Sequence, residues 1–254
     1  VEGPYLGVSW DGTGYGLDGS IWGGECFRVE NGYYDRVAHL RPFNLPGGDA
    51  AIRESWRSAA SLLFELKKKS PKSDEQNGMP HFSPVLREVG TSNEQAKIRY
   101  MLEKGINTVP TTSVGRLFDA VASISGLAHQ NRFEGQAAMM LENEIGALQT
   151  EEAYSLNSGD WAPLLERVLK DRREEVPVSR IAARFHNALV NWIVEVAGKV
   201  GEKQIVLSGG VFQNRYLTER AAAVLESSGY KVHMHQRVPP NDGGIALGQV
   251  VMAS

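Results

Sequence analysis

The chain has 254 residues, of which 42% are hydrophobic and 22% charged, the composition of an ordinary globular protein rather than a disordered or fibrous one. Its 27 Lys and Arg against 30 Asp and Glu give a net charge of −3, which disfavours nucleic-acid and anionic-membrane binding. No segment resembles a membrane helix or a signal peptide. The single cysteine, Cys26, excludes an intrachain disulfide and a four-cysteine zinc site, and it suits a cytoplasmic location.

The N-terminal part of the chain is predicted to form three strands. An apolar segment at 5–10 and a second at 21–29 are the first two candidates. The Asn31-Gly32 pair is a strong hairpin signal, and it leads into a third strand at 33–40. Prolines and glycines from 42 to 48 predict a loop.

From Asp49 the apolar residues follow a helical period. Asp49 is the expected N-cap of a helix that runs to residue 63, and an exposed polar connection is expected up to Pro80. Further helices are predicted over 93–104, 112–125, 134–147 and 160–173.

The clearest helical pattern covers 180–199, with Ser179 as its expected cap and His186 as a structural residue inside it. The remaining elements are expected to be a strand at 204–207, a helix at 215–228, a strand at 231–235 and a helix from 245. This order, three strands followed by many helices and then alternating strands and helices, predicts an α/β fold.

Four glycine-rich loops beside strand ends or helix starts indicate phosphate chemistry, because glycine lets backbone N–H groups approach a phosphate. No P-loop motif is present. Residues 14–19 match a dinucleotide-binding pattern, but a strand-like segment follows where that fold requires a helix, which disfavours a dinucleotide site.

Two of these loops follow predicted strands. In the first, Asp11 could hold a divalent cation while Gly12 and Gly14 admit phosphate oxygens; a β-turn in which Asp11 bonds its own backbone is equally compatible. In the second, residues 208–214, the backbone could pass under a flat ring and Asn214 could bond a base or a sugar. The alternative there is a plain strand-to-helix connection.

The other two loops precede predicted helices. Asp242 is either a second metal-binding carboxylate or a helix N-cap. Asp119 lies one helical turn beyond Gly115, and a carboxylate there could accept both hydroxyls of a ribose.

Eight short motifs occur in a fixed order along the chain, at residues 11–16, 22–25, 39–43, 45–49, 115–120, 133–138, 208–214 and 241–244. Together they resemble the C-terminal part of the HypF hydrogenase-maturation carbamoyltransferases, and the resemblance spans nearly the whole chain. Individual motifs, such as 208–210, also resemble the TsaD-type tRNA threonylcarbamoyl transferases.

This resemblance implies an actin-like, Hsp70-like (ASKHA) two-lobed α/β ATPase fold. Residues 1–110 would be the remainder of a first lobe whose beginning precedes Val1, and 111–254 a second lobe with the nucleotide-binding loops. The implied reaction uses ATP and carbamoyl-adenylate, the latter made by a neighbouring HypF module. The carbamoyl group passes to the C-terminal cysteine of HypE and becomes a cyanide ligand of nickel–iron hydrogenase.

The resemblance also implies roles for individual residues. Asp11 and Asp242 would bind a divalent metal (Fe, Zn or Mg), and the nucleotide would contact Gly12, Thr13, Gly14, Gly115, Asp119, Glu134, Gly209, Gly210 and Asn214. The family's metal site also uses a histidine pair, which would precede Val1 and is not present in this chain. No catalytic residue is assigned. Since the nucleophile comes from HypE, Cys26 is expected to be a buried apolar residue.

Two other functions remain open from the sequence. An O-carbamoyltransferase that acts on a small-molecule hydroxyl would share the fold and the chemistry, but it would need an acceptor pocket. A nucleotide-binding module without turnover is the second alternative, and the missing histidine pair favours it.

Overall fold

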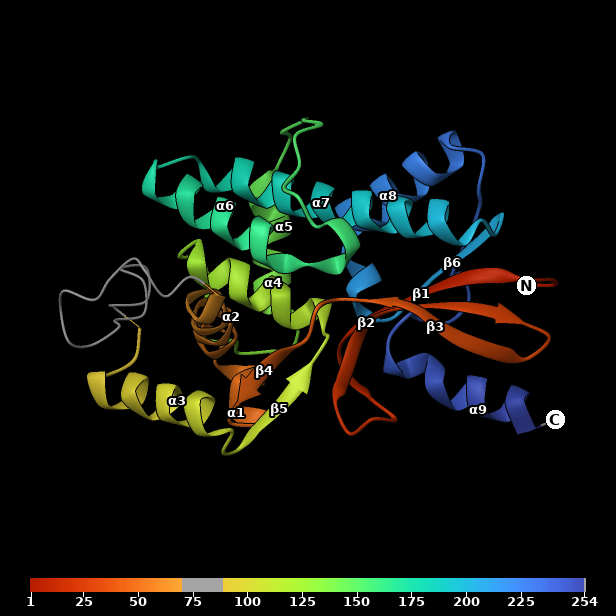
Figure 1. The fold of residues 1–254 in the computed structure, drawn as a ribbon. Coiled ribbons are helices and arrows are strands. Elements are labelled where there is room, and N and C mark those ends of the chain that lie inside the picture. Colours follow the sequence, from red (N-terminus) through yellow and green to blue (C-terminus); the bar gives the residue numbers. More distant parts are fainter. Residues whose placement is uncertain (70–88, 254) are drawn as a thin grey trace.

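A mixed seven-stranded sheet forms the centre of the computed structural model, which describes residues 1–69 and 89–253 (Figure 1). The strands are β1 (Tyr5–Tyr15), β2 (Ile21–Glu30), β3 (Tyr33–His39), β4 (Phe43–Pro46), β5 (Thr108–Thr111), β6 (Gln204–Ser208) and β7 (Lys231–Met234). Their order is β4-β5-β2-β1-β6-β7, and β3 pairs with β2. The expected exposed connection up to Pro80 lies largely outside the described residues.

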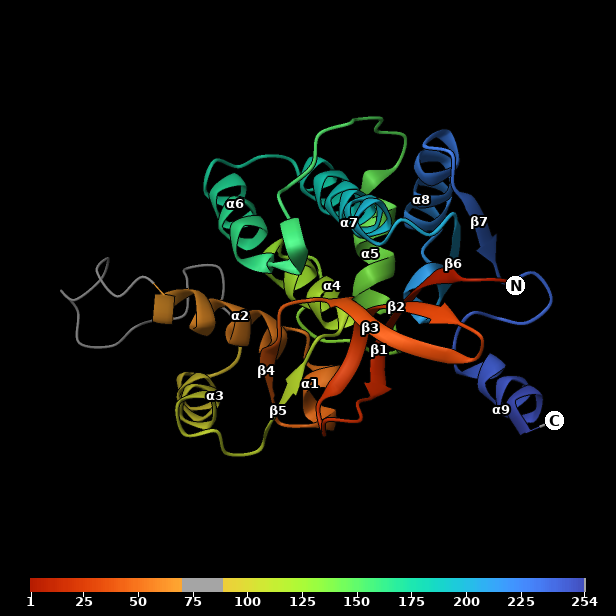
Figure 2. The same ribbon diagram turned by 45° about the vertical axis from the view of Figure 1, so that its right-hand side comes forward.

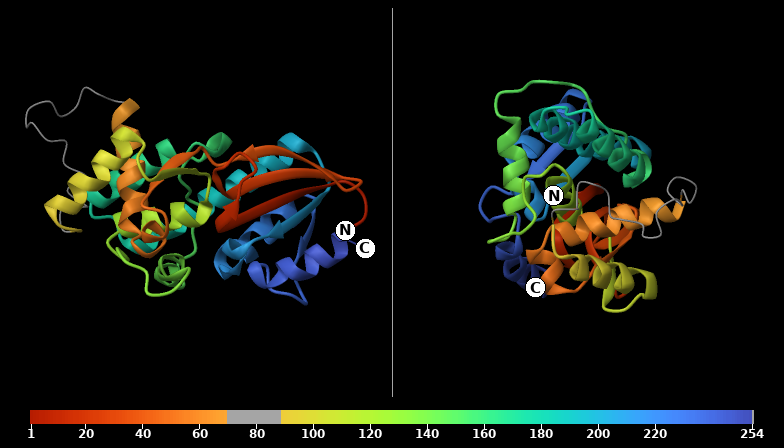
Figure 3. Two further views of the ribbon diagram at one scale, coloured as in Figure 1. Left: turned by 90° about the horizontal axis from the view of Figure 1, so that it is seen from below. Right: turned by 90° about the vertical axis from the view of Figure 1, so that its left-hand side faces the viewer.

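The helices of the described part are α1 (Asp49–Arg53), α2 (Trp56–Lys69), α3 (Ser92–Lys104), α4 (Val114–Ile124), α5 (Gln136–Ile145), α6 (Trp161–Arg173), α7 (Val178–Val200), α8 (Arg215–Ser227) and α9 (Ile245–Ala253). Helices α7 and α8 lie on one side of the sheet and α9 on the other (Figures 1 and 2). Helices α2 and α3 lie at the end of the molecule opposite the β2–β3 hairpin (Figure 3).

Strand β1 is longer than the sequence predicted. It continues through the expected loop at 11–14 to Tyr15, and its pairing with β2 shifts register between Trp10 and Gly14. The Asp11–Gly14 segment is therefore an irregularity within a hairpin rather than a loop after a strand. The β2–β3 hairpin follows the prediction, because Asn31 and Gly32 both have positive φ, 53° and 79°.

The helix predicted from Asp49 to residue 63 is two helices, α1 and α2, separated at Glu54 and Ser55. The Ser55 hydroxyl donates to the carbonyl oxygen of Ala128 at 2.6 Å, which ties this break to a distant segment. Two expected caps are also wrong. Gly48 precedes α1, so Asp49 is its first residue, and Pro177 precedes α7, so Ser179 lies inside that helix.

Helix α4 lies in the interior, and nearly all of its residues are buried. It contacts α2, α5, α6 and strand β1. At the sheet, Trp10 of β1 stacks on Trp192 of α7 and on Phe212, with ring centroids 5.1 and 5.6 Å away. These contacts hold the helical layer against the ends of β1 and β6.

Strands β1 and β6 pair in parallel from Leu6 to Ser9, so one sheet joins residues on both sides of the expected lobe boundary between 110 and 111. The division of the chain into lobes stays a prediction. Cys26 is fully buried as expected, and burial raises the pKa of its thiol to about 12. Within the described residues, no helix is long and apolar enough to cross a membrane.

Candidate functional site

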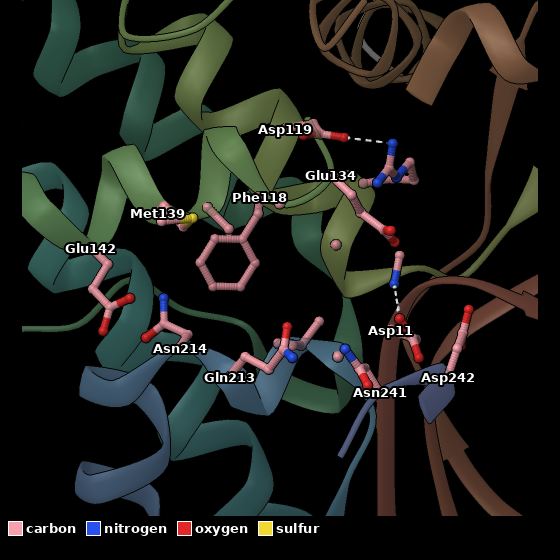
Figure 4. A pocket seen from close by; sticks show the side chains of 17 residues that line it. Asp11, Phe118, Asp119, Glu134, Met139, Glu142, Gln213, Asn214, Asn241 and Asp242 are labelled. Carbon is pink, nitrogen blue, oxygen red and sulfur yellow. Dashed lines mark hydrogen bonds and ion pairs between the residues drawn. The ribbon is translucent and has the colours of Figure 1, made fainter. Parts of the chain in front are cut away.

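A cavity of about 570 Å³ opens where β1, α4, α5 and the segments after β6 and β7 meet (Figure 4). Predicted site residues from β1, from α4, from the segment before α5 and from the segments after β6 and β7 line it, namely Asp11, Gly12, Gly115, Asp119, Glu134, Gly210, Asn214 and Asp242. Thr13, Gly14 and Gly209 were also expected at the site, but they are not among its lining residues.

Sheet register brings Asp11 next to the glycines that follow β6. Because Ser9 pairs with Ser208, the chain leaves β6 level with Trp10 and Asp11. A Cβ placed on Gly210 would lie 2.9 Å from the Asp11 carboxylate oxygen Oδ1. The same oxygen accepts a hydrogen bond from the Gly12 N–H at 2.7 Å. The carboxylate is therefore held close to the backbone of Gly12 and Gly210.

Gly209 has a structural role beneath the cavity. Its φ is +102°, and a Cβ there would lie 2.0 Å from the carbonyl oxygen of Trp10. Only glycine fits such a position without displacing the strand. The Gly209 N–H donates to the Pro240 carbonyl oxygen at 2.9 Å. This bond attaches the segment that carries Asp242 to the end of β6.

Asp11 and Asp242 therefore line the same cavity although they come from opposite ends of the chain (Figure 4). Asn241 caps the short helical turn that begins at Asp242 by accepting from the Gly243 N–H at 3.1 Å. The Asp242 carboxylate is thus not the cap, and it is exposed.

The start of α4 is fastened to the Asp11 segment. The Ser113 hydroxyl caps α4 and lies 2.7 Å from the Asp11 carbonyl oxygen and 2.8 Å from that of Gly12. A Cβ on Gly115 would lie 2.7 Å from the Gly12 Cα. Glycine at 115 therefore permits helix and strand to approach closely, and the first turn of α4 faces the cavity.

Asp119 is buried and already has two partners. Its carboxylate forms an ion pair with Arg116 at 2.8 Å and accepts a hydrogen bond from the Asn131 side chain at 3.0 Å. Burial raises the pKa of Asp119, while Arg116 and Asn131 oppose that shift. A carboxylate has about four acceptor positions, so this one retains capacity for a hydroxyl donor.

Asn214 occupies the other end of the cavity and is oriented by two bonds. Its Oδ1 caps α8 by accepting from the Leu217 N–H at 2.9 Å, and its Nδ2 lies 2.9 Å from the Nε2 of His186. The His186 Nδ1 lies 2.8 Å from the Ala182 carbonyl oxygen, which can only accept. Nδ1 therefore carries the proton, and Nε2 accepts from Asn214.

Between these ends the wall is apolar, with Phe118, Met139 and Val211 among its residues. Glu142 lies near Asn214, and Glu134 points toward Asp11 (Figure 4). The Glu142 carboxylate accepts from the Tyr216 N–H at 2.9 Å. The cavity thus has an apolar middle, an amide and a carboxylate at one end, and carboxylates with glycine backbone at the other.

Comparisons with known proteins show which family the chain belongs to. Residues 7–249 match the family model described as the carbamoyltransferase Kae1-like domain, second subdomain, of HypF. The chain belongs to this family. It is therefore a HypF-type carbamoyltransferase domain.

Individual relatives match along almost the whole chain. It is 36% identical to carbamoyltransferase HypF of a Synechocystis strain and 32% identical to a probable HypF of Methanocaldococcus jannaschii, over 99% and 96% of its length. It spans about a third of each of those proteins, 34% and 32%.

Two solved structures share the α/β fold of this HypF-type domain. A full-length HypF in the phosphate- and nucleotide-bound form superposes with a TM-score of 0.88 at 36% identity, covering 100% of this chain and 40% of its own. HypF of T. kodakarensis gives 0.80 at 27% identity, covering 98% and 34%.

Arg116 is the site residue of the HypF-type domain that sequence reasoning passed over. It lies inside the motif at residues 115–120, of which only Gly115 and Asp119 were predicted to contact the nucleotide, although it lines the cavity and pairs with Asp119. The sequence feature that could have indicated it is a basic residue directly after Gly115, in the first turn of a predicted helix. Glu142 and Phe118 were missed because only the packing of α4 and α5 brings them to the cavity.

Metal-binding capacity in this part of the chain is limited. Among residues 1–69 and 89–253, no group of three His, Cys, Asp or Glu side chains is arranged to hold a metal ion. Asp11 and Asp242 share the cavity, but they supply only carboxylate oxygens. This donor set suits a hard cation that takes its remaining ligands from water or phosphate, whereas Fe and Zn favour imidazole or thiolate ligands.

Proposed function

We propose that the cavity binds an adenine nucleotide, ATP or carbamoyl-adenylate, as the donor site for carbamoyl transfer. The observation that carries this proposal is the meeting of Asp11, Gly12, Gly115, Asp119, Gly210, Asn214 and Asp242 around one cavity. The nucleotide-bound state of a HypF that is 36% identical supports it.

The nucleotide would lie along the cavity with its base at the Asn214 end. Phe118, Met139 and Val211 offer apolar surface to a flat ring, and Asn214 retains an amide hydrogen and an acceptor position for the base. The ribose would then lie near Asp119 and Glu134. The phosphate would reach Gly12 and Gly210, where no side chain separates it from the backbone.

The carboxylates at the phosphate end of the cavity are ligands of the kind that a divalent cation prefers. Asp11 and Asp242 would hold it, as one or two carboxylates together with phosphate oxygens commonly hold Mg²⁺. When bound, such an ion would neutralise phosphate charge. The residues of this chain would position the nucleotide and keep its acyl phosphate aligned for attack.

The acceptor in this proposal is the C-terminal cysteine of HypE. Its thiolate sulfur attacks the carbamoyl carbon, the C–S bond forms, and the C–O bond to the phosphate breaks. AMP leaves with the electron pair, and the acceptor becomes a thiocarbamate. No nucleophile of this chain is needed, which agrees with the burial of Cys26.

We place this domain within a two-lobed, actin-like architecture whose other parts include the adenylate-forming module. The matching family model supports this placement because it describes the second subdomain of a larger domain. The relatives support it because this chain spans only about a third of their length. Residues 1–110 and 111–254 would contribute to different lobes around the cavity.

Label transfer tests the proposal. The chain is incubated with ATP, Mg²⁺, [¹⁴C]carbamoyl phosphate, the remaining HypF modules as a separate polypeptide, and a peptide that ends in cysteine. We expect label on the peptide, none on a matched peptide that ends in serine, and at least a tenfold lower rate with Asp11→Asn.

Two results would contradict carbamoyl transfer to a thiol. One is label on a small hydroxylated acceptor but not on the cysteine peptide, which would favour the O-carbamoyltransferase alternative. The other is nucleotide binding by the folded chain without any label transfer, which would leave a binding module.

A further inference from the structure

The charged side chains that line the cavity are mostly acidic. Arg116 is the only basic side chain among the described residues that line it, whereas the lining carboxylates are Asp11, Asp119, Glu134, Glu142 and Asp242. A field of this sign repels phosphate. Any anion that binds there needs a positive group placed at the position of its charge.

The Arg116 guanidinium is both buried and incompletely paired. The residue is 4% exposed, and its Nη1 forms the 2.8 Å ion pair with Asp119. Its Nε is buried and has no hydrogen-bond partner in the described part of the chain. Burying a charged donor without a partner is unfavourable, so an unused donor beside a cavity indicates a ligand that completes it.

The position of the guanidinium indicates which part of a ligand it meets. A Cβ on Gly12 would lie 3.1 Å from Nη2, so the group rests against the Asp11–Gly12 backbone. On its other side is Asp119. Arg116 therefore lies between the expected ribose site and the carboxylates expected to hold the metal.

We infer that Arg116 binds the phosphoryl group next to the ribose and makes the cavity selective for a nucleotide over a nucleoside. This inference rests on the proposed function. A guanidinium offers five N–H donors in a planar fork that matches the oxygens of a phosphate. The pair with Asp119 holds the guanidinium in place, and its Nε has no partner in the described part of the chain.

Calorimetric titration with adenosine and with AMP, both at one Mg²⁺ concentration, separates the two parts of the ligand. Replacing Arg116 by Met removes the charge and retains much of the side-chain volume. A charge-assisted hydrogen bond contributes about 1.5–3 kcal/mol, so AMP affinity should fall roughly 10- to 150-fold in Arg116→Met. Adenosine affinity should change less than threefold, and Arg116→Lys should lie between wild type and Arg116→Met for AMP.

Two further variants separate binding from folding. Arg116→Met combined with Asp119→Asn leaves no unpaired buried carboxylate, and near-UV circular dichroism checks its fold. Because Asp119 is placed at the ribose, this double variant is compared with Asp119→Asn alone, relative to which it should lose AMP affinity but keep its adenosine affinity. The matched control removes a second ion pair, between the half-buried Arg184 and the buried Asp171, whose atoms are 2.5 Å apart and which does not line the cavity. Arg184→Met with Asp171→Asn should bind both ligands as the wild type does.

An equal loss of AMP and adenosine affinity in a folded Arg116 variant, relative to the parent protein that retains Arg116, would assign the residue a structural role and overturn the inference. Unchanged AMP affinity would overturn it as well, while the proposed function would stand. Failure of the wild type to bind either ligand would instead overturn the proposed function, and the inference with it.

Discussion

His186 provides a pH test of the packing behind the cavity. Its imidazole is completely buried between Ala182 and Asn214, and burial lowers its pKa to about 4. An unfolded histidine titrates near 6.5. Below that pH the imidazole binds a proton in the unfolded chain but stays neutral in the folded chain. Acid therefore stabilises the unfolded state relative to the folded one.

The magnitude follows from these two pKa values. The shift of about 2.5 units corresponds to about 3 kcal/mol when both titrations are complete. Between pH 7 and pH 5 the unfolded imidazole becomes almost fully charged while the folded one stays neutral. Over that interval His186 should lower the free energy of unfolding by about 2 kcal/mol, and the lost stability returns as the pH is raised again.

Urea unfolding at pH 7, 6 and 5 measures this effect when wild type is compared with His186→Gln. Glutamine can offer an amide oxygen to the Asn214 side chain, but it does not titrate. The other ionisable groups are common to both proteins, so the difference between their pH slopes isolates residue 186. Parallel curves for the two proteins would refute the assignment of a neutral, buried imidazole.

The remaining predictions concern glycines and a buried carboxylate. Gly209→Ala should lower stability by more than 2 kcal/mol or prevent folding, because its Cβ would meet the Trp10 carbonyl at 2.0 Å; a thermal melt measures this. Gly198→Ala in α7 is the matched control, since no atom lies within 4 Å of its Cβ, and it should gain about 0.5–1 kcal/mol. Glu25→Gln should lose about 3 kcal/mol in urea unfolding, because the buried Glu25 carboxylate accepts from Arg36 at 2.9 Å; a loss under 1 kcal/mol would contradict this.

Local patterns predicted most of the elements but not their interruptions. Helices α3, α4, α6 and α8 begin within two residues of the predicted positions, because their caps and apolar periods are encoded locally. The break at Ser55 was missed since the bond that fixes it goes to Ala128, far along the chain. Strands β4 and β5 were missed because each has four residues and contains a proline.

The cavity could be predicted only in part for a similar reason. Asp11, Gly210 and Asp242 were expected together because they flank strand ends and match family motifs, and all three line one cavity. Thr13 and Gly14 were expected beside them as members of one loop. They continue strand β1 instead, so the chain carries them away from the lining. Arg116 required knowledge of how α4 packs on Gly12.

Calorimetric titration of the chain with ATP, in the presence and absence of Mg²⁺, shows whether the cavity binds a nucleotide together with a cation. We expect micromolar binding that Mg²⁺ strengthens, and loss of that strengthening in Asp11→Asn and in Asp242→Asn. Absence of ATP binding by the folded chain, or binding that both variants leave equally dependent on Mg²⁺, would contradict it.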